Sequence, residues 1–365
     1  MSKRKLKKIL FVYRAPRGKV YQDWQKGQGP DSLLFGFNHL KKMGYQVDFY
    51  DTAYSPLNIF HPLFYPLEHL IIAQTGMGFK IDQAAILLAK VRNYDVIVGT
   101  GDSAGLPILA LKYFGIIKKP IIFMTAGLAG AIKGKENTAV GKFYKKILPV
   151  ADIFTSYAQV EIDFFEKEMG IKKGKILYMP LATDWQYFSR KSNVKRTVIC
   201  SVGVESGRDY KTLFKAVKDQ PLKVEVACHT DNIKDLTIPS NVKVHLNIPV
   251  DKVLKLYQRS LISVVPCFER FRSSGQMVLL ESAAAGLPII ASKILGITSA
   301  FDFGHERHIL LTRPQDPRDL RQKIQTLTEN KALRERIAKN ASMLVKQQYT
   351  TYHLAKRLAK FIDNL

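Results

Sequence analysis

The chain has 365 residues, 46% of them hydrophobic, which is enough for two domains with sizeable cores. Its formal net charge of +25 indicates an anionic partner: a nucleic acid, a membrane surface or a polyanionic substrate. Alternatively, the charge reflects a lysine-rich proteome, and the protein has no specific anionic partner. No apolar run approaches the roughly 18 residues that span a bilayer, so we expect no membrane-spanning segment.

The first residues, MSKRKLKKILFVY, pair a basic start with a short apolar run and lack a small-residue cleavage site. They predict a first strand rather than a signal peptide. The cysteines are far apart and no CxxC motif occurs; they are Cys200, Cys228 and Cys267. We therefore expect reduced thiols and a cytoplasmic protein.

Strands and helices alternate in the first half of the chain. Short apolar runs predict strands at 9–13, 45–50, 95–100 and 121–124. Asp31 or Ser32 is placed to cap a helix over 33–43, which Gly44 ends. This order predicts a parallel sheet with crossover helices, and ligands of such sheets collect beyond the carboxyl ends of the strands.

Two segments interrupt this alternation. Residues 54–72 are apolar and aromatic and contain several prolines. Residues 138–149 predict a helix with one apolar face and with Lys142, Lys145 and Lys146 on the others. A basic amphipathic helix of this kind either lies on an anionic membrane or packs its apolar face into the core, and both interpretations stay open.

The second half opens with a strand over 197–203 that ends in Gly203. Arg208 follows in a polar loop, and Asp209 is placed to cap the next helix. Further along, the pattern predicts a strand at 224–227 and helices at 251–259, 317–328 and 332–348.

Residues 262–292 predict a strand, a loop, a helix and a second strand, in that order. Ser273 or Ser274 is expected to cap the helix, and Gly286 occupies the position after its end where a left-handed residue is favoured. The loop lies at the positive end of the helix dipole, with Arg270 and Arg272 in it, and so suits a phosphate.

Glu281 lies two turns into this helix, too far from its first amides to cap them. An acid at this place in a phosphate site accepts hydrogen bonds from ribose hydroxyls, as in dinucleotide folds. A solvated glutamate on an ordinary helix is the alternative, and the spacing alone does not decide between them.

The stretch resembles the donor-site signature of the family 4 glycosyltransferases, of the group 1 type. That signature has two glutamates separated by seven residues, an Ala-rich helix end, Gly-x-Pro and a strand. Its second half is matched by Glu281, Ala283, Ala285, Gly286, Pro288 and Ile290. Its first glutamate falls on Ser273, and Ser-Ser-Gly-Gln before the helix resembles a known variant.

The resemblance implies an α/β protein of the GT-B fold, with two Rossmann-like domains facing a cleft. We expect an acceptor-side domain over 1–188, with 346–365 crossing back to it, and a nucleotide-sugar donor domain over 189–345. In the family, a basic residue at the place of Arg208 contacts the diphosphate. The donor-binding residues implied are Glu281, Ser273, Ser274, Gly275, Gln276, Gly203, Gly296 and Ile297.

The implied reaction moves a sugar from a nucleotide-diphosphate sugar to an acceptor hydroxyl with retention of configuration. Charge builds on the leaving diphosphate, and Arg208 with the amides near Ser274 and Gly275 supplies the opposite charge. We find no Asp-x-Asp or His/Cys ligand spacing and expect no metal and no cofactor. Relatives carry a histidine where Thr125 stands here, and Asp102 is the candidate acid on the acceptor side.

Two other classes of function stay open. A nucleotide-sugar epimerase of the same fold needs acids and histidines in its site, for which Glu205 and His229 are the candidates. A non-catalytic basic protein that binds membranes or nucleic acid is the other class. No RNP, zinc-finger or helix-turn-helix signature supports nucleic acid as a partner.

Relatives that glycosylate membrane lipids dock through a basic N-terminal domain, which implies a lipid-linked acceptor or a cell-surface polysaccharide precursor. An anionic membrane surface is then a partner, with the protein peripheral on its inner face. The features that support docking are the segment 54–72 and the residues Lys3, Arg4, Lys5, Lys7, Lys8, Lys142, Lys145 and Lys146.

Overall fold

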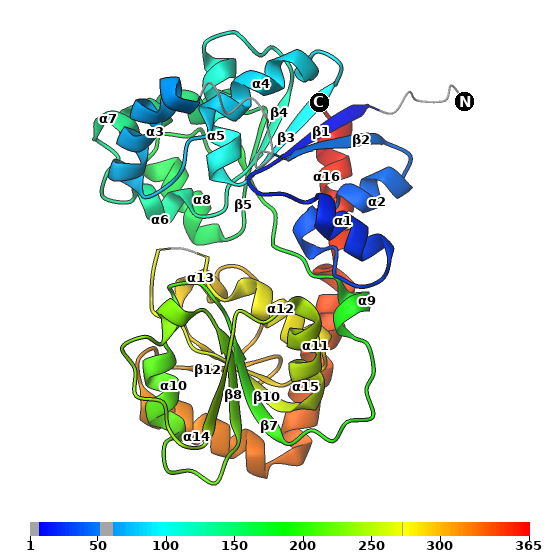
Figure 1. The fold of residues 1–365 in the computed structure, drawn as a ribbon, viewed down its shortest axis with the longest axis vertical. Helices are drawn as coiled ribbons and strands as arrows, with labels where there is room; N and C mark the ends of the chain where they lie inside the picture. The colour runs from blue at the N-terminus through cyan, green and yellow to red at the C-terminus, as the bar shows by residue number, and fades with distance from the viewer. Residues whose placement is uncertain (1–6, 52–60, 272) are drawn as a thin grey trace. The chain divides into compact units, whose positions relative to one another are not determined.

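The computed structural model describes residues 7–51, 61–271 and 273–365. The chain divides into two compact units (Figure 1). The N-terminal unit comprises the described residues of 1–23, 33–180 and 352–365, and the C-terminal unit comprises those of 24–32 and 181–351. Lys3, Arg4, Lys5, Arg272 and the first part of the 54–72 segment lie outside the described residues.

The N-terminal unit is built on a six-stranded parallel sheet in the order β2-β1-β3-β4-β5-β6. Its strands are β1 (Lys8–Tyr13), β2 (Gln46–Asp51), β3 (Val96–Thr100), β4 (Ile121–Met124), β5 (Ile153–Ser156) and β6 (Ile176–Tyr178). Every residue of β3, β4 and β5 is buried, as the continuous apolar runs predict for strands covered on both faces.

The helices of this unit are α1 (Gly18–Gln25), α2 (Phe37–Lys42), α3 (His61–Thr75), α4 (Ile81–Val91), α5 (Asp102–Tyr113), α6 (Leu128–Ile132), α7 (Ala139–Ile147), α8 (Gln159–Lys167) and α16 (Thr351–Asp363). The single helix expected over 33–43 is wrong. Phe35 and Gly36 both have positive φ, 51° and 85°, so they separate a short 3-10 turn from α2.

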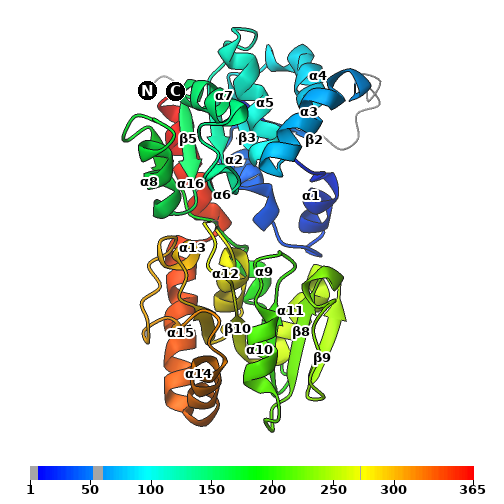
Figure 2. The ribbon, with the colours of Figure 1, turned by 90° about the vertical axis from the view of Figure 1, so that its left-hand side faces the viewer.

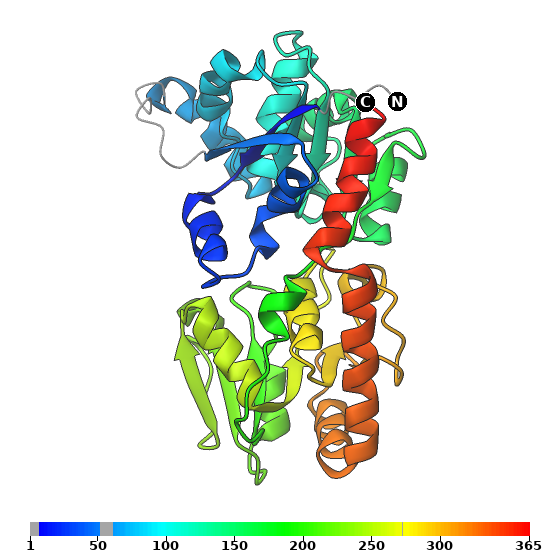
Figure 3. The same ribbon diagram turned by 90° about the vertical axis from the view of Figure 1, so that its right-hand side faces the viewer.

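The final helix packs on the N-terminal unit, as the fold class predicted. A Cβ built on Gly36 would lie 3.0 Å from the Cα of Ala355, so the two backbones are in close contact there. The Tyr45 hydroxyl donates to Asp363 Oδ1 at 2.8 Å, and Lys7 Nζ donates to the Ile362 carbonyl at 2.9 Å. Figure 3 shows α16 in red along this unit.

The C-terminal unit has a second six-stranded parallel sheet, in the order β12-β11-β10-β7-β8-β9. Figure 2 shows β8, β9 and β10 of this sheet. Its strands are β7 (Val198–Val202), β8 (Val224–Cys228), β9 (Val242–Leu246), β10 (Ser260–Val265), β11 (Ile289–Ser292) and β12 (Leu310–Thr312). Read from β9, this is the strand order of dinucleotide-binding folds, and the order reverses between β7 and β10.

The helices of this unit are α9 (Trp185–Phe188), α10 (Tyr210–Val217), α11 (Val250–Arg259), α12 (Gln276–Ala284), α13 (Leu295–Thr298), α14 (Pro317–Glu329) and α15 (Lys331–Gln348). After α13 the chain returns in the same direction, and Leu310 in β12 pairs with Ile290 in β11 in parallel.

Residues 24–32 belong to the C-terminal unit although they come early in the chain. The Asp31 amide donates to Asp184 Oδ2 at 3.1 Å, and Ser32 Oγ accepts from the Asp184 amide at 2.9 Å. The two residues expected to cap a helix therefore bind a turn far away in sequence. None of the helices in the described part of the chain has the length and hydropathy needed to cross a bilayer.

Candidate functional site

The candidate donor site lies where two neighbouring strands of the C-terminal sheet end. Cys200 of β7 pairs with Ser263 of β10, so the loops that follow these strands start side by side. The strand order reverses at this pair, which is where open α/β sheets bind their ligands. The loop after β7 carries Arg208, and the loop after β10 leads into α12.

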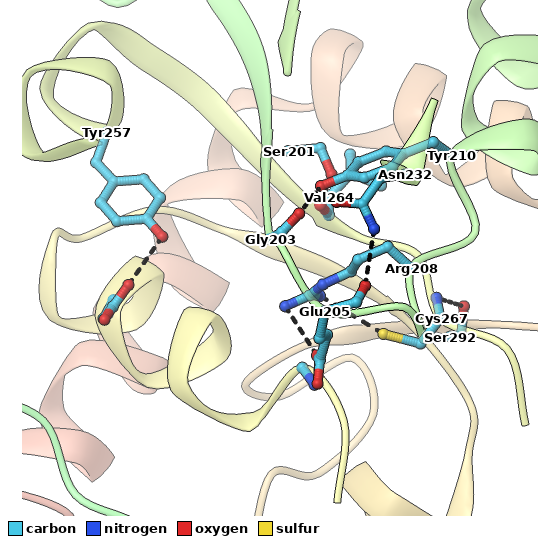
Figure 4. A network of polar contacts seen from close by, with 12 residues as sticks. Ser201, Gly203, Glu205, Arg208, Tyr210, Asn232, Tyr257, Val264, Cys267 and Ser292 are labelled. Carbon is cyan, nitrogen blue, oxygen red and sulfur yellow. Dashed lines mark hydrogen bonds and ion pairs between the residues drawn. The ribbon is translucent and has the colours of Figure 1, made fainter. Parts of the chain in front are cut away.

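Arg208 is the central cation of this site and is only 5% exposed (Figure 4). Its Nη2 lies 3.2 Å from Glu205 Oε1, and its Nη1 donates to the Cys267 sulfur at 3.5 Å. Burial lowers the pKa of Arg208, but the negative potential of its neighbours outweighs burial and raises it above the ordinary value. Burial also raises the pKa of the Cys267 thiol, so Glu205 rather than this thiol forms the ion pair with Arg208.

Gly203 and Gly275 leave the space that the guanidinium occupies. A Cβ on Gly203 would lie 2.0 Å from Arg208 Nε, and one on Gly275 would lie 3.4 Å from Arg208 Nη1. The Tyr210 hydroxyl donates to the Gly203 carbonyl at 2.7 Å and fixes the end of β7. The structure thus places two predicted site residues, Gly203 and Gly275, around the predicted cation of Arg208.

The start of α12 differs from the prediction. Its N-cap is Gly275, in the left-handed conformation with φ 76°, and no side chain caps it there. Ser273 and Ser274 are therefore not the cap, because the sharp turn at Gly275 separates them from the first helical amides. The Gly275 amide donates to Glu205 Oε1 at 2.7 Å, and the buried Ser274 Oγ has no partner among the described residues.

Gln276 and Gly296, two predicted donor-binding residues, are connected by a hydrogen bond. Gln276 Nε2 donates to the Gly296 carbonyl at 2.7 Å, and the side chain of Gln276 is buried. Ile297, one residue further along α13, is also buried. Gln276 therefore fixes the loop after β11 against the first turn of α12.

Glu281 is not the solvated glutamate of the alternative interpretation. Its Oε2 accepts a hydrogen bond from the buried Tyr257 hydroxyl at 3.2 Å. Burial raises the pKa of Glu281 to about 7, although Tyr257 and Arg208 act against that rise. A carboxylate held in this way is a desolvated acceptor for a ligand hydroxyl.

Asp102 and Thr125 lie together in the N-terminal unit, at the ends of β3 and β4. Thr125 Oγ1 donates to Asp102 Oδ1 at 2.6 Å, and the Ala126 amide donates to Asp102 Oδ2 at 3.1 Å. Asp102 is 4% exposed and Thr125 is fully buried. Burial raises the pKa of Asp102 to about 6 against the effect of these hydrogen bonds.

The residues that an epimerase would use do not form a pair of proton-transfer groups. His229 Nδ1 accepts from the Asp231 amide at 3.3 Å and lies 3.2 Å from the Asp231 carboxylate, which makes it the cap of a short 3-10 turn. Glu205 is bound to Arg208 and the Gly275 amide instead. Within the described residues, no cluster of three or more His, Cys, Asp or Glu side chains suits a metal ion.

Sequence reasoning missed Cys267, Tyr257 and Asn232 as parts of the site. Asn232 Nδ2 donates to the Glu205 carbonyl at 3.0 Å and holds the loop after β7. The three residues come from separate segments, and no local pattern marks them. Only the strand order places them beside Arg208 and Glu281.

Comparison with known proteins decides the family of the C-terminal unit. Residues 188–343 match the sequence profile of the family described as Glycosyl transferases group 1. This part of the chain is therefore similar to the group 1 glycosyltransferases. The match confirms the predicted resemblance and the predicted enzyme class, a glycosyltransferase. No curated protein matches the sequence.

Solved structures similar to the glycosyltransferase chain establish its fold. Sucrose-phosphate synthase from Thermosynechococcus elongatus is 16% identical, with a TM-score of 0.73 and 98% of each chain covered. Anabaena HepE in complex with UDP and glucose is 14% identical, with a TM-score of 0.68, covering 98% of this chain and 100% of its own. A trehalose-phosphate synthase from Burkholderia vietnamiensis is 12% identical, with a TM-score of 0.69 and 100% of each chain covered. The predicted GT-B fold class is confirmed.

Proposed function

We propose that this glycosyltransferase moves a hexose from a nucleotide-diphosphate sugar to an acceptor hydroxyl. The observation that carries the proposal is the buried Arg208 guanidinium, which lies beside the Gly275 amide at the point where the strand order reverses. The similar HepE structure holds UDP and glucose, which supports a nucleotide sugar as the donor.

The donor diphosphate takes its counter-charge from protein groups. Arg208 carries a fixed positive charge. Its attraction to the diphosphate strengthens as negative charge builds on this leaving group in the transition state. The first amides of α12 add partial positive charge from the helix dipole. Glu281 accepts the ribose hydroxyls, because its carboxylate is desolvated and fixed by Tyr257. We propose that the reaction needs no metal and retains the anomeric configuration, with the leaving phosphate accepting the acceptor's proton.

The acceptor proposed is lipid-linked, and α3 in the N-terminal unit carries the support for it. α3 packs inward through a narrow seam of Glu68, Ile71 and Thr75. The rest of the helix leaves large apolar side chains in solvent, at 40% to 72% exposure: Leu63, Tyr65, Leu67, Leu70 and Ile72. A helix that exposes this many large apolar side chains suits a protein or membrane contact.

An apolar cavity of about 310 Å³ lies beside this surface. Leu67 and Leu70 of α3 line it, together with side chains of α5 and α7 such as Leu111 and Phe143. Its chemistry suits a hydrocarbon chain. Leu67 and Leu70 belong both to the cavity lining and to the exposed apolar side chains of α3. A lipid tail in the cavity and a bilayer surface would therefore contact the same helix.

α7 contributes charge rather than an apolar membrane face. Val140, Tyr144 and Ile147 are buried in the unit, which is the core-packed arrangement left open by the sequence. Lys142 and Lys146 are exposed, and each lysine near an anionic surface adds about 1 kcal/mol of binding free energy. We propose that these lysines attract the membrane and that α3 supplies the apolar contact.

The enzymatic proposal is tested with a panel of radiolabelled UDP-, GDP- and ADP-sugars and lipid-linked acceptors. Transfer or slow hydrolysis of one donor, unaffected by EDTA and giving a retained anomer by NMR, is the expected result. Epimerisation of the donor contradicts the proposal in favour of the epimerase. No turnover of any donor favours the non-catalytic binding protein.

The membrane proposal is tested by sedimentation with vesicles. We expect binding to anionic vesicles, weak binding to neutral ones and release at high salt, because the Debye length shortens. Binding to anionic vesicles should fall in the triple variant Lys142→Glu, Lys145→Glu, Lys146→Glu. It should also fall in the double variant Leu63→Ser, Leu70→Ser. The same charge change at the exposed Lys252, Lys255 and Lys339 of the C-terminal unit is the control. If the protein binds neither anionic nor neutral vesicles at low salt, the membrane proposal is ruled out. A soluble acceptor is then favoured.

A further inference from the structure

We propose that the Glu205 carboxylate is an internal competitor of the donor diphosphate. The inference rests on the proposed function, since it assigns to Glu205 the position of a phosphate oxygen in the donor site. Donor binding must then displace this carboxylate, and its return helps to expel the nucleoside diphosphate product. Figure 4 shows Glu205 between Arg208 and the start of α12.

The contacts of one oxygen atom carry the proposal. Glu205 Oε1 accepts the Gly275 amide at 2.7 Å and lies 3.2 Å from Arg208 Nη2. A backbone amide at a helix start together with a guanidinium is the donor set that a phosphate oxygen takes. Gly275 is the N-cap residue of α12, and Glu205 is the group that accepts its amide.

A second observation shows that the site is built for more oxygens than Glu205 supplies. Arg208 Nε and Ser274 Oγ are buried and have no hydrogen-bond partner among the described residues. Arg208 and Ser274 are 5% and 1% exposed. Buried donors in folded proteins are almost always paired. A diphosphate has enough oxygens to reach these groups as well as the two that Glu205 holds.

The Glu205 side chain can leave the donor site without movement of the loop after β7. Its side chain is 30% exposed, whereas that of Arg208 is 3% exposed. Its backbone is held, because the Glu205 carbonyl accepts from Asn232 Nδ2 at 3.0 Å and from the Arg208 amide at 3.3 Å. Rotation of the side chain into solvent therefore exposes the two donors while the turn stays fixed.

The exchange is favourable because a diphosphate carries more negative charge than a carboxylate. A buried arginine without a charged partner is strongly destabilising, so Glu205 keeps the charge of Arg208 compensated between turnovers. The same contact lowers the apparent affinity for any anion at the site. Removing the charge of Glu205 should therefore strengthen binding of nucleoside diphosphates and of pyrophosphate.

The test is titration calorimetry with inorganic pyrophosphate, UDP, GDP and ADP. It compares the wild type with Glu205→Gln, which keeps an acceptor for the Gly275 amide, and with Glu205→Ala. Glu329→Gln, at an exposed position at the end of α14, is the matched control. We expect Glu205→Gln to bind pyrophosphate and the preferred diphosphate about tenfold more tightly, and the control to bind as the wild type does.

Unchanged or weaker binding by a folded Glu205→Gln variant overturns the inference, while wild-type binding leaves the proposed function intact. Weaker binding would mean that Glu205 positions Arg208 instead of competing with the ligand. If neither the wild type nor any variant binds any probe, the proposed function and this inference both fail. Glu205→Gln decides the outcome if Glu205→Ala does not fold.

Discussion

The two units place polar groups at the same kind of position, the carboxyl ends of central parallel strands, but with opposite chemistry. The C-terminal unit buries the cation of Arg208 there, and within the described residues Arg208 Nε and Ser274 Oγ have no hydrogen-bond partner. The N-terminal unit buries a carboxylate, Asp102, whose oxygens are taken by Thr125 and the Ala126 amide. The first arrangement is prepared to receive an anion, and the second is already satisfied.

The difference assigns separate tasks to the units. An anionic diphosphate gains from Arg208 and would be repelled by ionised Asp102. Asp102, with its pKa raised to about 6 by burial, is half protonated in mildly acidic solution and holds Thr125 in place. We therefore propose that the C-terminal unit alone binds the nucleotide and that Asp102 has a positioning role.

The largest effect is expected for Arg208→Ala. Removing this buried cation should lower kcat about 100-fold or more, because its charge acts most strongly on the transition state. Steady-state kinetics should show a larger fall in kcat than rise in KM. The exposed Arg318→Ala in α14 is the control and should leave both constants unchanged. A loss confined to KM would show that Arg208 binds ground and transition states equally.

A smaller effect is expected for Glu281→Ala. Loss of a charged acceptor for the ribose hydroxyls costs about 1.5–3 kcal/mol, or roughly tenfold to a hundredfold in nucleotide affinity. Calorimetry with the preferred nucleoside diphosphate measures it. Tyr257→Phe, which removes only the hydroxyl that fixes Glu281, should have a weaker effect in the same direction. Unchanged affinity in folded Glu281→Ala would remove Glu281 from the site.

The smallest effect on binding is expected for Asp102→Asn, which should instead change how stability depends on pH. The folded pKa of about 6 lies above the ordinary 3.8, so the native state binds more protons than the unfolded state between these values. Stability should therefore fall as pH rises from about 4 to about 6, by at most about 3 kcal/mol from this group.

Urea unfolding of the wild type and Asp102→Asn at pH 4.5 and 7 measures this difference. The variant should lose less stability over that interval than the wild type. Glu281 titrates in the same direction, with a pKa of about 7, and is common to both proteins. An identical pH dependence of the two proteins would show that Asp102 is not desolvated.

Much of this architecture is predictable because apolar periodicity reports buried strands directly. The strand expected at 121–124 is β4, and the cap expected at Asp209 accepts the Thr212 amide at 3.0 Å. Arg208 lies in the loop after β7 and Glu281 in the helix after β10, as expected, and their roles stay predictions. Gly286 has φ 70° and follows α12 as predicted.

The failures share a physical cause, which is tertiary contact that overrides local preference. Ser273 and Ser274 are good capping residues by type, yet Gly275 makes the turn and Glu205 takes its amide. Asp31 and Ser32 bind Asp184, which lies 153 and 152 residues further along the chain. No local pattern encodes these pairings, so they appear only when the strand order is known.

The most direct test of the division between the units is calorimetric titration of the preferred nucleoside diphosphate into three proteins: the wild type, Arg208→Ala and Asp102→Asn. We predict one site in the wild type, the same affinity in Asp102→Asn, and binding at least tenfold weaker in Arg208→Ala. Equal affinities of the wild type and Arg208→Ala, or a loss of binding in Asp102→Asn alone, would contradict the assignment of nucleotide binding to the C-terminal unit.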